Sequence, residues 1–146
     1  MKKLYLNQKT YLNKNSLYDF ILNMREYFNK SGDIVIIPSM CYLSILSKEN
    51  IVLGSQNIAE YNTTNQTGVT GDQLNSLGVE YAIIGHSERR NNNFENNHII
   101  NNKIRNALSS RILPILCVGE NKEEKNYNQT FDIIKKELLE AIKDVN

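Results

Sequence analysis

The sequence predicts an α/β protein built around a parallel sheet. Short apolar runs alternate along the chain with longer stretches of amphipathic, helical periodicity. Most of the short runs lack polar alternation, which is typical of strands that are covered on both faces. The first and fifth runs begin 108 residues apart over four repeats, or roughly 27 residues per strand–helix unit. This spacing fits right-handed βαβ crossovers.

Five apolar runs mark the expected strands. They lie at Leu4–Leu6, Ile34–Ile37, Ile51–Leu53, Tyr81–Ile84 and Ile112–Val118. Their lengths match those of strands rather than helices. Because no linker rich in Pro, Gly or Ser divides the series, we expect residues 1–146 to form a single domain.

Two helices are predicted most clearly. Ser16 is the expected N-cap of the first and Ser31-Gly32 its expected end. Between them, apolar side chains recur at helical spacing: Leu17, Phe20, Ile21, Met24, Tyr27 and Phe28. The second helix lies near the end of the chain, where Lys and Glu stand opposite an apolar stripe of Phe131, Ile134, Leu138, Ala141, Ile142 and Val145.

Composition excludes several classes of function. The chain has 17 Lys and Arg against 16 Asp and Glu, so its net charge of +1 offers no global field for a nucleic acid or an anionic membrane. No run of 18 apolar residues could span a bilayer, and the first residues lack the apolar core of a signal peptide. We therefore expect a cytoplasmic protein without nucleic-acid or membrane partners.

Cysteine and asparagine usage give two further expectations. Cys41 and Cys117 lie far apart and form no metal-binding spacing with histidine, so both are expected to be reduced structural residues. Asparagine occurs 22 times and is densest between Asn91 and Asn102. This tract could be disordered or a polar surface loop, and a solvated surface is the simpler interpretation.

The alternation of strands and helices fits two architectures: an open, doubly wound five-stranded sheet, or the first five units of an eight-stranded barrel. In both, ligands bind where the strands end. Lys9 follows the first strand, and His86 and Glu88 follow the fourth. These groups could bind and polarise a small anionic substrate. Singly, they could equally be a solvated lysine, a structural histidine and part of an ion-pair cluster, while His98 is expected at the surface.

The segment after the fourth strand carries a family resemblance. Its string Ile83-Ile84-Gly85-His86-Ser87-Glu88-Arg89-Arg90 resembles the signature of the triosephosphate isomerase family. Four shorter matches follow the family's order: Asn7-Gln8-Lys9, Ser55-Gln56-Asn57, Thr67–Asp72 and Cys117–Glu120. The resemblance implies the first five βα units of a (β/α)8 TIM barrel, with residues 1–146 as an incomplete barrel domain.

The family interconverts dihydroxyacetone phosphate and glyceraldehyde 3-phosphate in glycolysis and gluconeogenesis, through an enediolate and without a cofactor or a metal. By resemblance, Lys9 would meet the substrate phosphate and neutralise the enediolate, and Asn7 would orient it. His86, as a neutral imidazole, would donate to the developing oxyanion. Ser87 would shape the pocket, and Glu88 would hold Lys9 through an ion pair.

The resemblance also implies a homodimer. The loop from Tyr61 to Asp72 resembles the one that this family inserts into the neighbouring subunit. Thr70 would then support the partner's lysine and histidine. Asp72 would stand where a glutamate pairs with the first arginine of the signature, which is Arg89 here.

The chain also departs from the family pattern. Gln8 stands where tryptophan is usual and Thr10 where methionine is usual, although Glu95 falls where a buried carboxylate is expected. The family's catalytic glutamate, lid and phosphate-binding loops belong to its last three units, which have no counterpart in these residues.

We therefore expect little or no isomerase activity from this chain alone. It would be the amino-terminal portion of an isomerase, either a split or interrupted gene product that a separate C-terminal fragment could complement, or a truncated sequence. The alternatives are a non-catalytic remnant that binds a phosphorylated metabolite or a protein, and a partly folded product with an exposed sheet edge.

Overall fold

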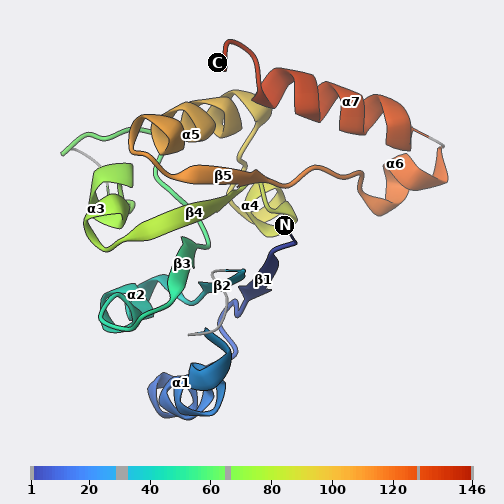
Figure 1. Cartoon of the computed structure of the whole chain (residues 1–146). Helices are drawn as coiled ribbons and strands as arrows, with labels where there is room; N and C mark the ends of the chain where they lie inside the picture. Colours follow the sequence, from blue (N-terminus) through green and yellow to red (C-terminus); the bar gives the residue numbers. More distant parts are fainter. Residues whose placement is uncertain (1, 29–32, 65–66, 128, 146) are drawn as a thin grey trace.

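The chain folds as a five-stranded parallel sheet with its strands in sequence order. The computed structural model describes residues 2–28, 33–64, 67–127 and 129–145 (Figure 1). The sheet order is β1-β2-β3-β4-β5, and every neighbouring pair is parallel. The strands are β1 (Leu4–Asn7), β2 (Ile34–Ile37), β3 (Val52–Ser55), β4 (Val79–Ile84) and β5 (Leu113–Leu116). All five predicted strands are present, with ends that shift by up to two residues.

Helices follow the strands in the expected alternation. They are α1 (Lys14–Phe28), the short 3-10 turn η1 (Met40–Tyr42), α2 (Leu43–Leu46), α3 (Gly71–Ser76), α4 (Ser87–Asn92), α5 (Asn97–Ser109), α6 (Lys122–Asn126) and α7 (Thr130–Ala141). Most are short, so they depend on packing against the sheet rather than on their own helical propensity.

The helices cover one face of the sheet. The larger core joins strand residues such as Ile36, Leu53 and Ala82 to residues of α1, α2, α3, α5 and α7. The opposite face carries a smaller cluster, formed by strand residues alone: Val35, Ile37, Tyr81 and Ile83. A doubly wound sheet would have helices on both faces and a reversal in strand order. The one-sided cover, the sequential order and the curl of the sheet in Figure 1 instead make this a partial (β/α)8 barrel.

The first helix begins earlier than the sequence pattern suggested. Lys14 is its first residue, and the backbone N–H of Ser16 donates to Oδ1 of Asn13 at 3.0 Å. Asn13 is therefore the cap, and the prediction of Ser16 was wrong. Asparagine caps as well as serine, and the apolar periodicity beginning at Leu17 could not distinguish the two positions. The predicted end at Ser31-Gly32 lies outside the described residues.

The asparagine-rich tract is largely helical rather than a loop. Asn96 caps α5 by accepting from the N–H of Ile99, and Asn106 is buried and donates to the carbonyl of Ala59 at 2.9 Å. Asn101 donates to the carbonyls of Ala141 and Lys143 near the end of α7. These side chains satisfy backbone groups that would otherwise be left without partners. The asparagines between Asn91 and Asn102 are exposed or partly exposed, as the surface interpretation expected, whereas Asn106, just beyond them, is buried.

The two outer strands and the last helix leave apolar surface uncovered. Within the described residues β1 and β5 are the edges of the sheet, and Leu113 of β5 is 53% exposed. The predicted stripe on α7 packs only in part, because Ala141 is buried while Phe131 and Leu138 are exposed. No helix of the described part of the chain is both long enough and apolar enough to cross a membrane.

We expect Gly54→Ala to destabilise the fold. A Cβ at this position would lie 2.8 Å from Cγ1 of Ile37, on the face opposite the helices, so the Ile37 side chain or the backbone would have to shift. Overpacking of this kind costs about 1–3 kcal/mol of unfolding free energy, measured by urea denaturation. Gly119→Ala is the matched control, because a Cβ there meets nothing within 4 Å. Equal unfolding free energies of the two variants would contradict the close packing of Gly54 against Ile37.

Candidate active site

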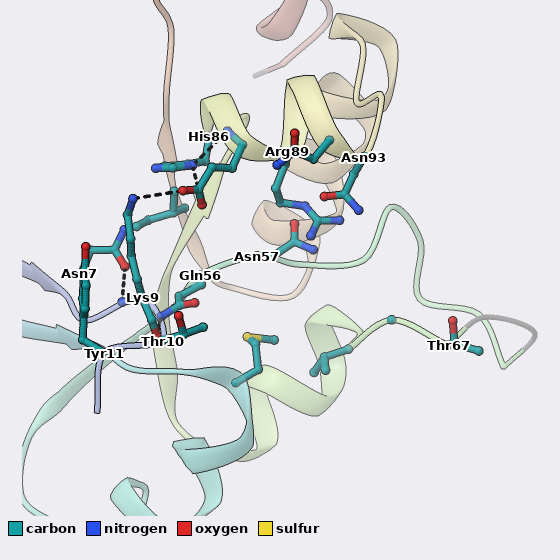
Figure 2. A pocket seen from close by; sticks show the side chains of 16 residues that line it. Asn7, Lys9, Thr10, Tyr11, Gln56, Asn57, Thr67, His86, Arg89 and Asn93 are labelled. Carbon is teal, nitrogen blue, oxygen red and sulfur yellow. Dashed lines mark hydrogen bonds and ion pairs between the residues drawn. The ribbon is translucent and has the colours of Figure 1, made fainter. Parts of the chain in front are cut away.

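A cavity of about 590 Å³ opens at the carboxyl ends of the strands. Asn7 and Lys9 reach it from the end of β1, Gln56 follows β3, and His86 follows β4 (Figure 2). The remaining lining residues are Thr10, Tyr11, Met40, Asn57, Thr67, Gly68, Val69, Ile83, Glu88, Arg89, Asn92 and Asn93. The topology of the sheet therefore brings together the ends of β1, β3 and β4, which are far apart in sequence.

Lys9 is held at the rim through both its backbone and its side chain. Its backbone is left-handed, with φ of 46°, and its N–H donates to Oδ1 of Asn7 at 3.1 Å. Its Nζ donates to Oε1 of Glu88 at 3.2 Å. Figure 2 shows the long side chain of Lys9 running from the end of β1 toward the segment of His86. The lysine therefore presents a positive charge on the same side of the cavity as the imidazole.

His86 is the N-cap of α4. Its Nδ1 accepts a hydrogen bond from the backbone N–H of Glu88 at 3.3 Å. An accepting Nδ1 carries no proton, so the neutral ring bears its proton on Nε2. With Nδ1 accepting, Nε2 is the ring nitrogen that can donate a hydrogen bond.

A buried charge cluster lies next to the cavity wall. Glu95 is 6% exposed, and its Oε1 accepts from Nε of Arg89 at 2.5 Å and from Nζ of Lys103 at 2.6 Å. Lys103 also donates to Oδ1 of Asn57 at 2.7 Å. Burial lowers the pKa of Lys103, and the hydrogen bond and charge of Glu95 oppose this only in part. The cluster fixes Asn57 and Arg89, which both line the cavity.

The structure brings most of the predicted site residues together. Asn7, Lys9, His86, Glu88 and Arg89 line one cavity, and the expected ion pair between Lys9 and Glu88 is present. Ser87 is the first residue of α4 and is exposed, but it is not part of the cavity lining.

Of the three predicted dimer residues, Arg89 lines the cavity, whereas Thr70 and Asp72 do not. Thr70 caps α3, where its hydroxyl accepts from the N–H of Gln73. Within one chain, Asp72 does not pair with Arg89. Asp72 contacts Asn62 and Ser110, and Arg89 pairs with Glu95.

Two cavity residues, Gln56 and Thr67, belong to segments that matched the family but were assigned no role in the site from the sequence. Thr67 lies three residues before Thr70 in the same loop and lines the cavity, whereas Thr70 does not. Gln56 donates to the carbonyl of Lys9 at 2.7 Å. Its position directly after a strand and within a family match were the available signals, but nothing in the sequence pairs residue 56 with residue 9.

The cysteines differ from each other. Both are free, but Cys41 is exposed, whereas Cys117 is half-buried beside the cluster of Val35, Ile37, Tyr81 and Ile83. Burial raises the pKa of the Cys117 thiol. Within the described ranges, no group of three or more His, Cys, Asp or Glu side chains is placed to hold a metal ion.

Comparison with known proteins gives one consistent result. The family model described as triosephosphate isomerase matches residues 2–146. Triosephosphate isomerase of Alkaliphilus oremlandii is 36% identical over 135 residues, which cover 87% of this chain and 54% of that protein. The enzyme of Mycoplasmoides gallisepticum is 33% identical over 96% of this chain and 58% of its own length.

Solved structures agree with these matches. The crystal structure of triosephosphate isomerase from Bartonella henselae superposes with a TM-score of 0.86 at 28% identity, covering 99% of this chain and 62% of that one. The chain thus spans about half the length of the curated relatives that it matches.

We expect Lys103→Met to destabilise the protein strongly. The substitution keeps the volume of the side chain but leaves the buried Glu95 with Arg89 as its remaining ion-pair partner. Removing one partner of a buried pair costs about 3–5 kcal/mol of unfolding free energy. The double variant Lys103→Met, Glu95→Leu should recover more than half of this loss, because no carboxylate is then left in the interior. Additive losses in urea denaturation would contradict this account.

Lys103 should also shape the pH dependence of stability. Burial lowers its pKa in the folded state below the ordinary value of 10.5, so between these two values the unfolded chain binds more protons than the folded chain. The contribution of Lys103 to the unfolding free energy should therefore rise with pH in this interval. Urea denaturation at increasing pH should show this rise relative to Lys103→Met. Parallel curves for the two proteins would contradict it.

Proposed function

Because the chain belongs to the triosephosphate isomerase family, we propose that it supplies Lys9 and His86 to a site that interconverts dihydroxyacetone phosphate and glyceraldehyde 3-phosphate. The observation that carries this proposal is the convergence of the two side chains, from the ends of β1 and β4, on one cavity. As a member of a glycolytic family, the chain is proposed to act in the cytoplasm and to need no cofactor.

The proposed chemistry follows from the charges at the rim. The ammonium group of Lys9 attracts the phosphate dianion and offsets the negative charge that develops on the enediolate. His86 donates from Nε2 to the substrate carbonyl, which makes the adjacent C–H more acidic. Nε2 is free for this role because Nδ1 already accepts from the N–H of Glu88. Asn7 orients Lys9 by accepting from its backbone N–H.

The reaction also needs a general base, which must lie within hydrogen-bond reach of the proton that it removes. Among the described residues that line the cavity, Glu88 alone has a carboxylate, and this carboxylate is paired with Lys9. We therefore propose that the base comes from polypeptide outside these 146 residues. The matched relatives are long enough to include such a segment, since this chain covers 54% of one and 58% of another.

Two contacts with other polypeptide are proposed. A segment completing the barrel would pair with the free edges of β1 and β5 and cover Leu113 and the exposed stripe of α7. A second copy would meet the loop of residues 61–72 in a homodimer. Residues 61–64 of this loop are exposed in the single chain, which supports this part of the proposal.

A non-catalytic role is the second candidate. The cavity has a lysine and a histidine suited to a phosphate ester, but its carboxylate is already paired with the lysine. Such a site would bind a phosphorylated metabolite without converting it. Measuring binding and turnover separately distinguishes the two candidates.

We expect the 146-residue chain alone to show no isomerase turnover above the buffer rate. Mixing it with the part of the Alkaliphilus oremlandii enzyme that it does not match should restore turnover, since that part would bring the missing base. His86→Gln should reduce the restored rate by at least about a hundredfold, a loss in the range expected for a preorganised oxyanion donor. A folded mixed complex without turnover would favour the non-catalytic candidate, and full activity of His86→Gln would exclude the proposed role of His86.

We expect Lys9→Ala to weaken binding of glycerol 3-phosphate by roughly ten- to hundredfold, the contribution of one hydrogen bond to a charged group. Isothermal titration calorimetry measures the dissociation constant. Lys14→Ala is the matched control, because Lys14 opens α1 and is not part of the cavity lining. Equal affinities of the two variants would show that the phosphate binds elsewhere.

A further inference from the structure

We propose that Gln56 is a positioning residue whose side-chain amide holds the backbone of Lys9 in its left-handed conformation and so directs the Lys9 ammonium group into the cavity. The binding of an anion by Lys9 rests on the proposed function. The left-handed conformation of Lys9 does not depend on it.

The left-handed conformation of the Lys9 backbone needs support from neighbouring groups. A φ of 46° is uncommon for a residue with a Cβ and costs about 1–3 kcal/mol. Such a conformation persists only where the surroundings impose it. Both polar groups of the Lys9 backbone have side-chain partners: its N–H donates to Asn7, and its carbonyl accepts from Nε2 of Gln56 at 2.7 Å.

The ion pair between Lys9 and Glu88 is too weak to impose this backbone conformation. The Lys9 and Glu88 side chains are 41% and 62% exposed. An exposed pair of this kind contributes about 0–1 kcal/mol, less than the strain requires. The hydrogen bond from Gln56 is shorter and part-buried, and it acts directly on the strained backbone.

Gln56 is itself fixed to the sheet. It directly follows the last residue of β3, and its Nε2 also lies 3.5 Å from the carbonyl oxygen of Ile37 at the end of β2. The next residue, Asn57, accepts from the buried Lys103. The amide of Gln56 therefore joins the ends of β1, β2 and β3, and it fixes the backbone of Lys9 relative to the sheet.

The test compares Lys9 in four proteins: native, Gln56→Leu, Gln56→Glu and Gln129→Leu. Gln129→Leu is the matched control, because Gln129 is exposed and makes no capping hydrogen bond through its side chain. Nuclear magnetic resonance reports φ of Lys9 through its backbone chemical shifts. At neutral pH we expect loss of the left-handed shifts in Gln56→Leu and in Gln56→Glu, and their retention in Gln129→Leu. Unchanged Lys9 shifts in either folded Gln56 variant would overturn the proposal.

The Gln56→Glu variant adds a reversible control. Acidification protonates the introduced carboxylate and returns an O–H donor beside the Lys9 carbonyl, so the left-handed shifts should reappear in Gln56→Glu but not in Gln56→Leu. A general loss of structure would not recover in one variant alone. Failure of the shifts to reappear in a folded Gln56→Glu protein would overturn the role of the donor.

Binding of inorganic phosphate then measures the consequence. We expect Gln56→Leu to weaken binding by about tenfold in the native background and to change nothing in Lys9→Ala, because it acts through Lys9. Equal effects in both backgrounds would overturn the positioning role. Loss of the left-handed shifts without any binding of phosphate to the native chain would support the positioning of Lys9 and count against the proposed function instead.

Discussion

One guanidinium group joins the elements that form the rim of the cavity. Arg90 is largely buried, and its Nε donates to the carbonyl of Gly85 at 2.9 Å, while a second nitrogen donates to the carbonyl of Cys117 at 3.3 Å. The third nitrogen contacts Asn97 and pairs with Glu137 at 3.1 Å. The ends of β4 and β5, the start of α5 and the middle of α7 thus converge on one side chain. His86 follows Gly85 directly, so its backbone is held in place by this network.

The three charged residues after Ser87 have different roles because a helix turns by about 100° per residue. Glu88 faces the cavity and pairs with Lys9 in partly exposed surroundings. Arg89 points into the buried cluster around Glu95, and Arg90 reaches back to the ends of the strands. The short helix α4 therefore carries the carboxylate at the rim of the cavity, the arginine that pairs with a buried carboxylate, and the arginine that links the ends of β4 and β5. This division explains why so much of the site depends on one short segment of sequence.

Sequence reasoning recovered the strands and the convergence at the rim, because both follow from local pattern and sheet geometry. Buried parallel strands are apolar throughout, and their carboxyl ends lie at one edge, which is enough to place Lys9 near His86. It missed Asn13 as a cap, the buried role of Asn106 and the contact of Gln56, since each depends on a neighbour that local pattern does not specify. It also could not foresee that the apolar stripe of α7 would be only partly covered. Amphipathicity shows that a face is apolar but not what packs against it.

The sequential strand order has a consequence for how the protein folds. Each strand pairs with the strand that precedes it in the chain, so no contact within the sheet has to wait for a distant segment. Contact order is accordingly low for a parallel sheet, and a polypeptide leaving the ribosome can dock each strand–helix unit onto the one already formed. The free edge of each newly docked strand is then available to pair with the next strand.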